Sequence, residues 1–432
     1  MPADIAHPPS RWLTAEEAIA RLGVSRQTLY AYVSRSRIGV VAAPDDPRRS
    51  LYDAADVRRL ADRNRRGRSR HAVAVSTISW GEPILESAIT RIEHGRLEYR
   101  GHDAIALAAT ATLEEIAGLL WQVDGLPLPR ADRVRGSWPK ARTPAGAAER
   151  CIVAAAGLAM VGRWTGRVEG VLPDAVRILD RIAWAASGAP GTVTQKSSLP
   201  LHERLASVWG VGPKAADLIR RALVLTADHE LNASTYAVRV VASTRAPLGA
   251  CVLAGLAALV GPLHGGMTNE VRVLLADPSV VQDPESAIAG RLARGERIPG
   301  FGHPLYPDGD PRAVALLPRQ SSHFFGWPVI EVMQRMTGIG PNIDYALLLL
   351  EKRLRLPTGA AFAMFAVGRT VGWIAHALEQ WHDGTLIRPR AVYPGAAAPT
   401  DQVAALPTAA TGAPGTSSPG LPASRFNTSR RS

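Results

Sequence analysis

The amino-acid sequence predicts a mainly α-helical protein, with a small basic module at its start and a polar tail at its end. The 432 residues are 46% apolar and 20% charged, which is the composition of a globular protein with a sizeable core. Between residues 73 and 395, apolar residues recur at helical spacing, as in 113–121 and 214–225, and strand-like alternation is scarce. The length favours two or three domains.

The basic charge is concentrated at the start of the chain. Residues 1–70 contain 14 arginines and 8 acidic residues, which is half of the net charge of +12. This segment is therefore expected to meet an anionic partner. Cys151 and Cys251 are too few and too distant for a disulfide framework or a thiolate metal site, so we expect no metal and a cytoplasmic setting. The sequence contains no run of 18 apolar residues, so no membrane span is predicted. The N-terminus lacks the pattern of a secretory signal, so export is not expected.

Residues 11–62 carry the spacing of a helix-turn-helix. Thr14 and Glu17 form a capping-box pattern, and the helix that they begin is expected to stop at Gly23. Ser25 can cap a second helix over 26–35, after a tight turn. Side chains of this second helix could contact phosphates or base edges in a major groove. The candidates for DNA contact are Arg26, Gln27, Tyr30 and Arg35.

A two-strand wing over 38–52, around a Pro/Asp turn, and a helix over 54–61 complete this module. Residues 11–62 thus resemble the winged helix-turn-helix domains of the excisionase and MerR type. Two roles remain open, namely DNA contact and packing within the chain or a dimer. The basic run 63–72 is either a solvated linker or an arm that contacts phosphates.

Four separated stretches of the helical zone carry polar groups that a packed core does not need. Taken alone, each has a structural explanation: a satisfied core histidine, a helix-capping turn, a histidine that ties down its loop, or an acid that complements a helix dipole. The stretches are 228–234 with His229, 261–270 with His264, 298–306 with His303 and the following Arg312, and 340–345 with Asp344, where Pro341 suits the first turn of a helix.

Arg369 is surrounded by apolar residues on a helix that should begin near Pro357. Burying an unpaired guanidinium costs several kcal/mol, so this arginine needs an anion. The anion could be an internal carboxylate or a substrate.

These stretches occur together with further motifs in a characteristic order. They are Gly95-Arg-Leu-Glu-Tyr-Arg-Gly-His-Asp103, Asp228-His-Glu-Leu-Asn-Ala-Ser234, His264-Gly-Gly266, Gly300-Phe-Gly-His303, Asp310-Pro-Arg312, Pro341-Asn-Ile-Asp344, Gly368-Arg-Thr-Val-Gly-Trp-Ile-Ala-His376 and Arg388-Pro-Arg390. In this order, residues 73–395 resemble the citrate synthase family, which includes 2-methylcitrate synthases. The resemblance implies a two-domain helical fold, with a large domain over 73–265 and 359–395 and a small domain over 266–358. Residues 396–432, rich in Ala, Pro, Thr, Gly and Ser, are predicted to form a disordered tail.

The resemblance also implies an activity, which is the condensation of acetyl-CoA with oxaloacetate and hydrolysis of the resulting thioester, without a cofactor. Asp344 would be the general base, His264 would donate to the thioester oxygen, and His303 would polarise the ketone. A helix starting after Gly266 would keep His264 neutral, whereas desolvation would have to raise the pKa of Asp344 against its own helix dipole. The oxaloacetate carboxylates would be held by His229, Arg312, Arg369 and, from the partner subunit of a homodimer, Arg388.

The sequence departs from the family pattern at two places. One extra residue precedes Asn269, which would displace this side chain, and Pro307 stands where the family usually has a basic residue near the CoA phosphates. Arg294 and Arg297 are the nearby cations that could replace it.

Two alternatives stand beside citrate synthesis. One is a 2-methylcitrate synthase that uses propionyl-CoA, because one methylene in an apolar pocket is worth only about 1 to 3 kcal/mol. The other is a DNA-binding regulator whose citrate synthase-like part senses CoA thioesters or dicarboxylates. The presence of every candidate catalytic group favours the enzyme.

Overall fold

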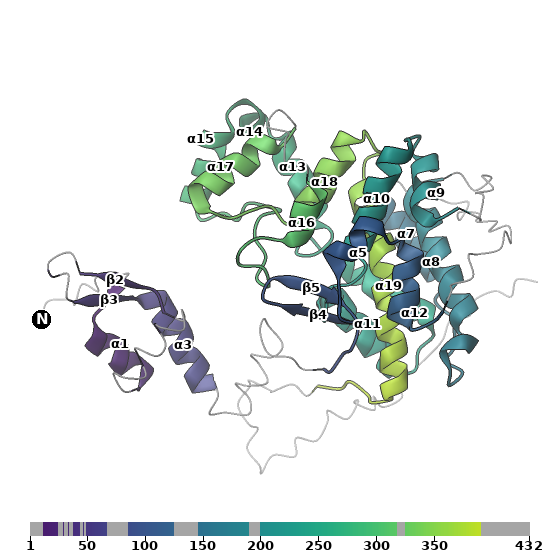
Figure 1. Ribbon diagram of the computed structural model, residues 1–432, viewed down its shortest axis with the longest axis horizontal. Helices are drawn as coiled ribbons and strands as arrows, with labels where there is room; N and C mark the ends of the chain where they lie inside the picture. Colours follow the sequence, from purple (N-terminus) through teal and green to yellow (C-terminus); the bar gives the residue numbers. More distant parts are fainter. Residues whose placement is uncertain are drawn as a thin grey trace, which may run out of the picture. The chain divides into compact units, whose positions relative to one another are not determined.

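The computed structural model describes residues 12–24, 29, 33, 38–43, 46, 49–66, 85–124, 146–189, 199–317 and 325–389. Helices dominate these residues, which confirms the predicted fold class (Figure 1). The chain divides into two compact units, Met1–Ile387 and Arg388–Ser432. Only residues 388 and 389 of the second unit are described, so the predicted tail 396–432 lies outside the described residues.

The N-terminal module has its own sheet and core. Strands β1 (Trp12–Leu13) and β2 (Val40–Ala42) both pair antiparallel with β3 (Ser50–Asp53), in the order β1-β3-β2. The two strands predicted over 38–52 therefore form as the β2–β3 pair, and β1 adds a third strand that the sequence did not predict. Helix α1 (Ala15–Leu22) starts with the predicted capping box and ends at Gly23, whose φ of 63° is left-handed.

The third element of this module is longer than predicted. Helix α3 (Ala54–Arg66) continues past the expected end at residue 61 and includes the first four residues of the basic run. In the second predicted helix, only Leu29 and Val33 are described, and both are helical. Leu29 is fully buried in the module core together with Val57. The DNA-contact candidates Arg26, Gln27, Tyr30 and Arg35 lie outside the described residues.

The rest of the chain begins with a small sheet that the sequence did not predict. Strands β4 (Thr90–Glu93), β5 (Arg96–Tyr99) and β6 (His102–Asp103) pair antiparallel in chain order. The helices that follow are α5 (Ala104–Thr110), α6 (Leu113–Trp121), α7 (Ala147–Ala156), the 3₁₀ turn η1 (Val168–Gly170), α8 (Leu172–Ser187), α9 (Leu201–Val208), α10 (Pro213–Leu225), α11 (Ala233–Ser243) and α12 (Leu248–Leu259).

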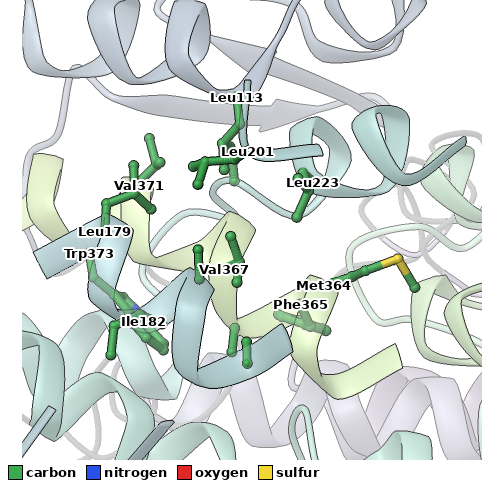
Figure 2. Packing of buried hydrophobic residues seen from close by; sticks show 14 of the residues in the cluster. Leu113, Leu179, Ile182, Leu201, Leu223, Met364, Phe365, Val367, Val371 and Trp373 are labelled. Carbon is green, nitrogen blue, oxygen red and sulfur yellow. The ribbon is translucent and has the colours of Figure 1, made fainter. Parts of the chain in front are cut away.

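These helices surround α19 (Ala360–Asp383), which lies at the centre of the largest core. Figure 2 shows Phe365, Val367, Val371 and Trp373 of α19 among leucine and isoleucine side chains of the neighbouring helices. Among the described residues, α19 is the one helix that is long and apolar enough to span a membrane. Its apolar window is wholly buried inside the protein, as in the core helix of a folded domain.

A second core lies within residues 271–349. It is built by α13 (Met267–Ala276), α14 (Pro278–Gln282), α15 (Pro284–Ala293), α17 (Trp327–Thr337) and one face of α18 (Ile343–Arg353). The short α16 (Pro311–Leu316) packs against α18 and α10. Residues of α18 contribute to both cores, Leu347 to the larger and Leu348 to the smaller, because successive residues of a helix point in different directions. This shared helix carries Asp344.

Candidate active site

The predicted site residues come from loops and helix starts that meet beside α19. His229 lies between α10 and α11, His264 in the turn before α13, and His303 in the loop before α16. Arg312 lies in the first turn of α16 and Asp344 in the first turn of α18. Arg369, on α19 itself, is 1% exposed.

Three aromatic rings form a cluster in this site. The ring centroids of His229 and His303 are 4.9 Å apart, edge to face, and that of Tyr306 lies 5.0 Å from His303. Nε2 of His229 and the hydroxyl of Tyr306 are hydrogen-bonded at 3.0 Å. Burial lowers the pKa of His229 well below its usual value, and the nearby charge of Arg312 lowers it further. His229 is therefore neutral at pH 7.

Tyr306 was not among the functional residues expected from the sequence. It is 2% exposed, and the Arg312 guanidinium lies 5.3 Å from its ring centre. Burial raises the pKa of Tyr306 to about 12, so its hydroxyl keeps its proton. The available sequence signal is a tyrosine three positions after His303 in the same Gly- and Pro-rich loop, because functional residues are frequent in such loops.

Arg312 has an internal partner. Its Nε and Nη2 donate to the two carboxylate oxygens of Asp310, at 2.9 and 2.8 Å, and both side chains are at most 2% exposed. Asp310 also caps α16 and accepts from the backbone N–H of Ile343 at 2.9 Å. Burial opposes the charged form, but Asp310 more than compensates and raises the pKa of Arg312. The predicted substrate ligand is thus a fixed cation with Nη1 outside the pair.

Arg369 differs from Arg312. Its Nε donates to the backbone oxygen of Thr226 at 2.9 Å, and Nη1 and Nη2 have no hydrogen-bond partner among the described residues. Burial lowers the pKa of Arg369 to about 10, which leaves it charged at neutral pH. Of the two anions that the sequence left open, no described carboxylate bonds to this guanidinium. These two nitrogens are therefore buried donors whose hydrogen bonds an anion could satisfy.

His264 is held by a serine and a tryptophan. Its Nε2 lies 2.8 Å from Oγ of Ser234, to which the indole N–H of Trp373 donates at 3.1 Å. Burial lowers the pKa of His264 to about 3, followed by the charges of Arg369 and Arg312. Helix α13 does start at Met267, after the two glycines, but burial and these two cations are the main causes of the low pKa. His264 can therefore act as a neutral donor.

The proton of His303 can be placed from its surroundings. The backbone N–H of Leu305 donates to Nδ1 of His303 at 3.2 Å, so Nδ1 is an acceptor. Burial, and then the charge of Arg312, lowers the pKa of His303 to about 4. The ring is then neutral at pH 7 and carries its proton on Nε2. That N–H is a suitable donor for polarising a carbonyl group.

Asp344 is a buried acid at the start of α18. The sequence had suggested that Pro341 lies in the first turn of this helix. The helix is instead capped by Asn342, so Pro341 precedes the cap. Burial raises the pKa of Asp344 to about 7, although Arg312 and Arg369 act to lower it. Its Oδ1 is buried without a hydrogen-bond partner in the described part of the chain. Desolvation therefore outweighs the helix N-terminus, and the carboxylate is poised as a base near neutral pH.

The two buried arginines act electrostatically on the other groups of the site. The charges of Arg312 and Arg369 act together on the pKa values of His229, His264 and Asp344. Arg312 and Arg369 can bind a small anion, and the neutral rings of His264 and His303 can donate to and polarise a carbonyl group. The carboxylate of Asp344 can remove a proton from carbon. Within the described residues, no group of three or more His, Cys, Asp or Glu side chains could hold a metal ion.

Other predicted residues lie on the surface. Arg294 is exposed and its Nε donates to Glu296 at 2.6 Å, and Arg297 is exposed as well. Asn269 is an exposed residue of α13, and Pro307 is exposed in the loop after His303. Arg388 is exposed at the start of the second unit. Binding of CoA by Arg294 and Arg297, and donation of Arg388 to a partner subunit, stay predictions.

The fold and the site define a helical protein with a buried, positively charged centre that contains histidines and one acid. The profile of the family "Citrate synthase, C-terminal domain" matches residues 78–390, and the chain belongs to this family. The crystal structure of citrate synthase from Thermotoga maritima is similar, with a TM-score of 0.60 and 28% identity over 74% of this chain and 95% of that one.

Curated relatives match over different lengths. Citrate synthase 2 of Bacillus subtilis is 36% identical in an alignment 193 positions long that covers 42% of this chain and 52% of that protein. In this alignment the chain spans about half of the length of its relative. The 2-methylcitrate synthase of Shewanella oneidensis is 29% identical in an alignment 381 positions long, gaps included, that covers 79% of this chain and 96% of that protein.

Proposed function

We propose that the protein condenses acetyl-CoA with oxaloacetate and hydrolyses the product, so that acetyl-CoA, oxaloacetate and water give citrate and CoA. The observation that carries this proposal is the buried carboxylate of Asp344, whose Oδ1 has no hydrogen-bond partner among the described residues and whose pKa burial raises to about 7 against the charges of two buried arginines. A proton on the methyl carbon of a thioester is very weakly acidic. Its removal therefore needs both a general base with a raised pKa and a hydrogen-bond donor for the enolate oxygen.

Each group has a step in this reaction. Asp344 removes the methyl proton, and neutral His264 donates to the thioester oxygen on which negative charge develops. The enolate carbon then attacks the ketone carbon of oxaloacetate, whose oxygen accepts from Nε2–H of His303. Water finally adds to the citryl thioester, the C–S bond breaks, and the sulfur leaves as the thiol of CoA. The neutral state of both histidines allows them to donate without becoming competing acids.

The anion site serves the carboxylates of oxaloacetate. Arg369 offers Nη1 and Nη2, and Arg312 offers Nη1 from a position fixed by Asp310. His229 completes this side of the site, and its bond to Tyr306 holds the ring until a carboxylate arrives. In a homodimer, Arg388 of a second copy would add a further cation.

Release of free CoA from acetyl-CoA and oxaloacetate by the purified chain tests the reaction. Arg369→Leu tests the anion site, because oxaloacetate should raise the melting temperature of the wild type and leave that of the variant unchanged. An equal rise in the variant would show that Arg369 does not bind the substrate. No CoA release with any oxo acid would refute the enzyme assignment and favour a sensing role.

The second candidate reaction is 2-methylcitrate synthesis from propionyl-CoA. The alignment with the Shewanella 2-methylcitrate synthase supports it, because it spans 96% of that protein. The two acyl groups differ by one methylene, so the discrimination is expected to be within about 200-fold. The ratio of kcat/KM for acetyl-CoA and propionyl-CoA, measured at saturating oxaloacetate, decides between them.

For the N-terminal module we propose duplex DNA as the partner. Its separate core around Leu29 and Tyr52 and its arginine content support a self-contained basic domain. The full chain should bind duplex DNA with an affinity that falls by about 0.9 log units per log unit of salt for each phosphate contact. A chain without residues 1–70 should lose this binding and keep the condensation activity. Loss of activity without unfolding would instead make the module a structural part of the enzyme.

A further inference from the structure

The segment between α10 and α11 packs closely against α19. The backbone oxygen of Thr226 accepts from Nε of Arg369, and Oδ2 of Asp228 is bonded to Nε2 of His376 at 3.3 Å. Arg369 and His376 are seven residues apart and therefore share one face of the helix. Between them, Gly372 is required, because a Cβ there would lie 2.4 Å from Oδ1 of Asp228.

This packing places two opposite charges near each other without a bond between them. Arg369 and Asp228 are 1% and 0% exposed. Nη1 and Nη2 of Arg369 and Oδ1 of Asp228 are buried atoms without a hydrogen-bond partner in the described ranges. Asp228 is nevertheless the strongest of the charges that favour the cationic form of Arg369 and oppose the effect of burial on its pKa.

His376 orients the carboxylate of Asp228 through the hydrogen bond of its Nε2 with Oδ2. On the other side of the ring, Nη1 of Arg239 lies 3.4 Å from Nδ1 of His376, and a guanidinium can only donate. Arg239 has its own partner in Glu379. His376 and Arg369 outweigh burial and hold the pKa of Asp228 below its usual value.

We propose that Asp228, oriented by its bond with His376, is a positioning residue that stabilises the charged Arg369 in the substrate-free protein and leaves its two terminal nitrogens available for a substrate carboxylate. The contrast with Arg312 supports this role, because Asp310 occupies two nitrogens of that guanidinium directly. The inference rests on the proposed function in so far as the expected anion is oxaloacetate.

Asp228→Asn removes the charge and little else. Oδ2 accepts from His376 and from the backbone N–H of Glu230 at 3.1 Å, and an amide oxygen in its place can accept both bonds. Without the charge of Asp228, the substrate-free protein is less stable, because Arg369 stays buried without a nearby anion. Bound oxaloacetate then supplies the missing negative charge. We expect a lower melting temperature of the free variant and about tenfold tighter binding of oxaloacetate by calorimetry, with a larger ligand-induced thermal shift.

Asp180→Asn is the matched control, because Asp180 is also a buried aspartate, 8% exposed, with an arginine partner, Arg204. It should lower the melting temperature and leave the affinity for oxaloacetate at the wild-type value. Affinity of Asp228→Asn equal to or weaker than that of the wild type overturns the inference.

A second measurement needs no ligand. Asp228→Asn should destabilise the wild-type chain much more than an Arg369→Leu chain, because the second background has no buried cation to balance. Equal destabilisation in both backgrounds would mean that Asp228 acts through its hydrogen bonds alone, and would overturn the inference. This cycle also separates the two proposals, since a wild-type chain that ignores oxaloacetate but shows the coupling contradicts only the proposed function.

Discussion

Asp344→Asn is expected to make the protein more stable above neutral pH. The pKa of Asp344 is about 7 in the folded protein, against a usual value of 3.8. Between these two pH values the folded state holds a proton that the unfolded chain has lost, so stability falls as the pH rises through this window and stays low above it. A shift of about 3 units corresponds to about 4 kcal/mol at 1.36 kcal/mol per unit. Asparagine has the shape of the acid and no charge, so the variant avoids this loss.

Urea unfolding at several pH values tests the expectation. The difference in unfolding free energy between variant and wild type should be near zero at pH 4 and grow to at most about 4 kcal/mol at pH 8. If this difference in unfolding free energy is zero or constant across the pH range, the raised pKa of Asp344 is refuted, because folding of the wild type would then not oppose the ionisation of Asp344.

The same variant should be inactive. A positioned general base contributes about 10²- to 10⁴-fold, or about 3 to 5 kcal/mol of barrier, and an amide cannot accept the proton. Retention of more than about a tenth of the wild-type kcat would contradict the assignment of Asp344 as the base. A variant that is more stable and inactive is the expected signature of a residue whose burial serves catalysis.

Two further predictions concern buried contacts. Trp373→Phe removes the indole N–H that donates to Ser234, so it should lower kcat with little change in KM for oxaloacetate. The control Trp121→Phe loses a buried bond to the backbone oxygen of Val371 and should lower stability alone. Equal losses of kcat in both variants would contradict a link between Trp373 and His264. Glu351→Gln should lower the free energy of unfolding in urea by about 3 kcal/mol, because it leaves Arg272 without its buried charged partner. Glu285→Gln, from an exposed ion pair, should lower it by less than about 1 kcal/mol. Similar losses in both variants would show that the burial of Glu351 does not strengthen its ion pair.

The helices could be predicted because their signals are local. The 113–121 and 214–225 patterns became α6 and α10 within a residue, and the Thr14 capping box formed as expected. Boundaries set by tertiary contacts were less accessible. α3 runs five residues beyond its predicted end, and α19 starts at Ala360 and not near Pro357, since the preceding residues form a turn whose backbone N–H at Gly359 donates to Glu351.

The site residues could be selected from motifs, but their chemical states could not. No spacing rule reveals that Leu305 donates to Nδ1 of His303, or that burial drives the pKa of His264 down and that of Asp344 up. These are properties of the folded environment, because they depend on which charges and which apolar atoms surround each group. Tyr306 was missed for the same reason, since its hydroxyl finds His229 across 77 residues of chain.

The two buried arginines show why such contacts decide function. From the sequence, Arg312 and Arg369 are equivalent cations for one dianion. In the structure, Asp310 spans Nε and Nη2 of Arg312 and also anchors the start of α18, so this cation is fixed to the helix that carries Asp344. Arg369 is anchored through Nε alone and keeps two nitrogens without partners in the described part of the chain. In the proposed reaction, a substrate carboxylate would gain most from Arg369, because it would satisfy buried donors that are otherwise unpaired, whereas Arg312 would set where the second carboxylate lies relative to Asp344.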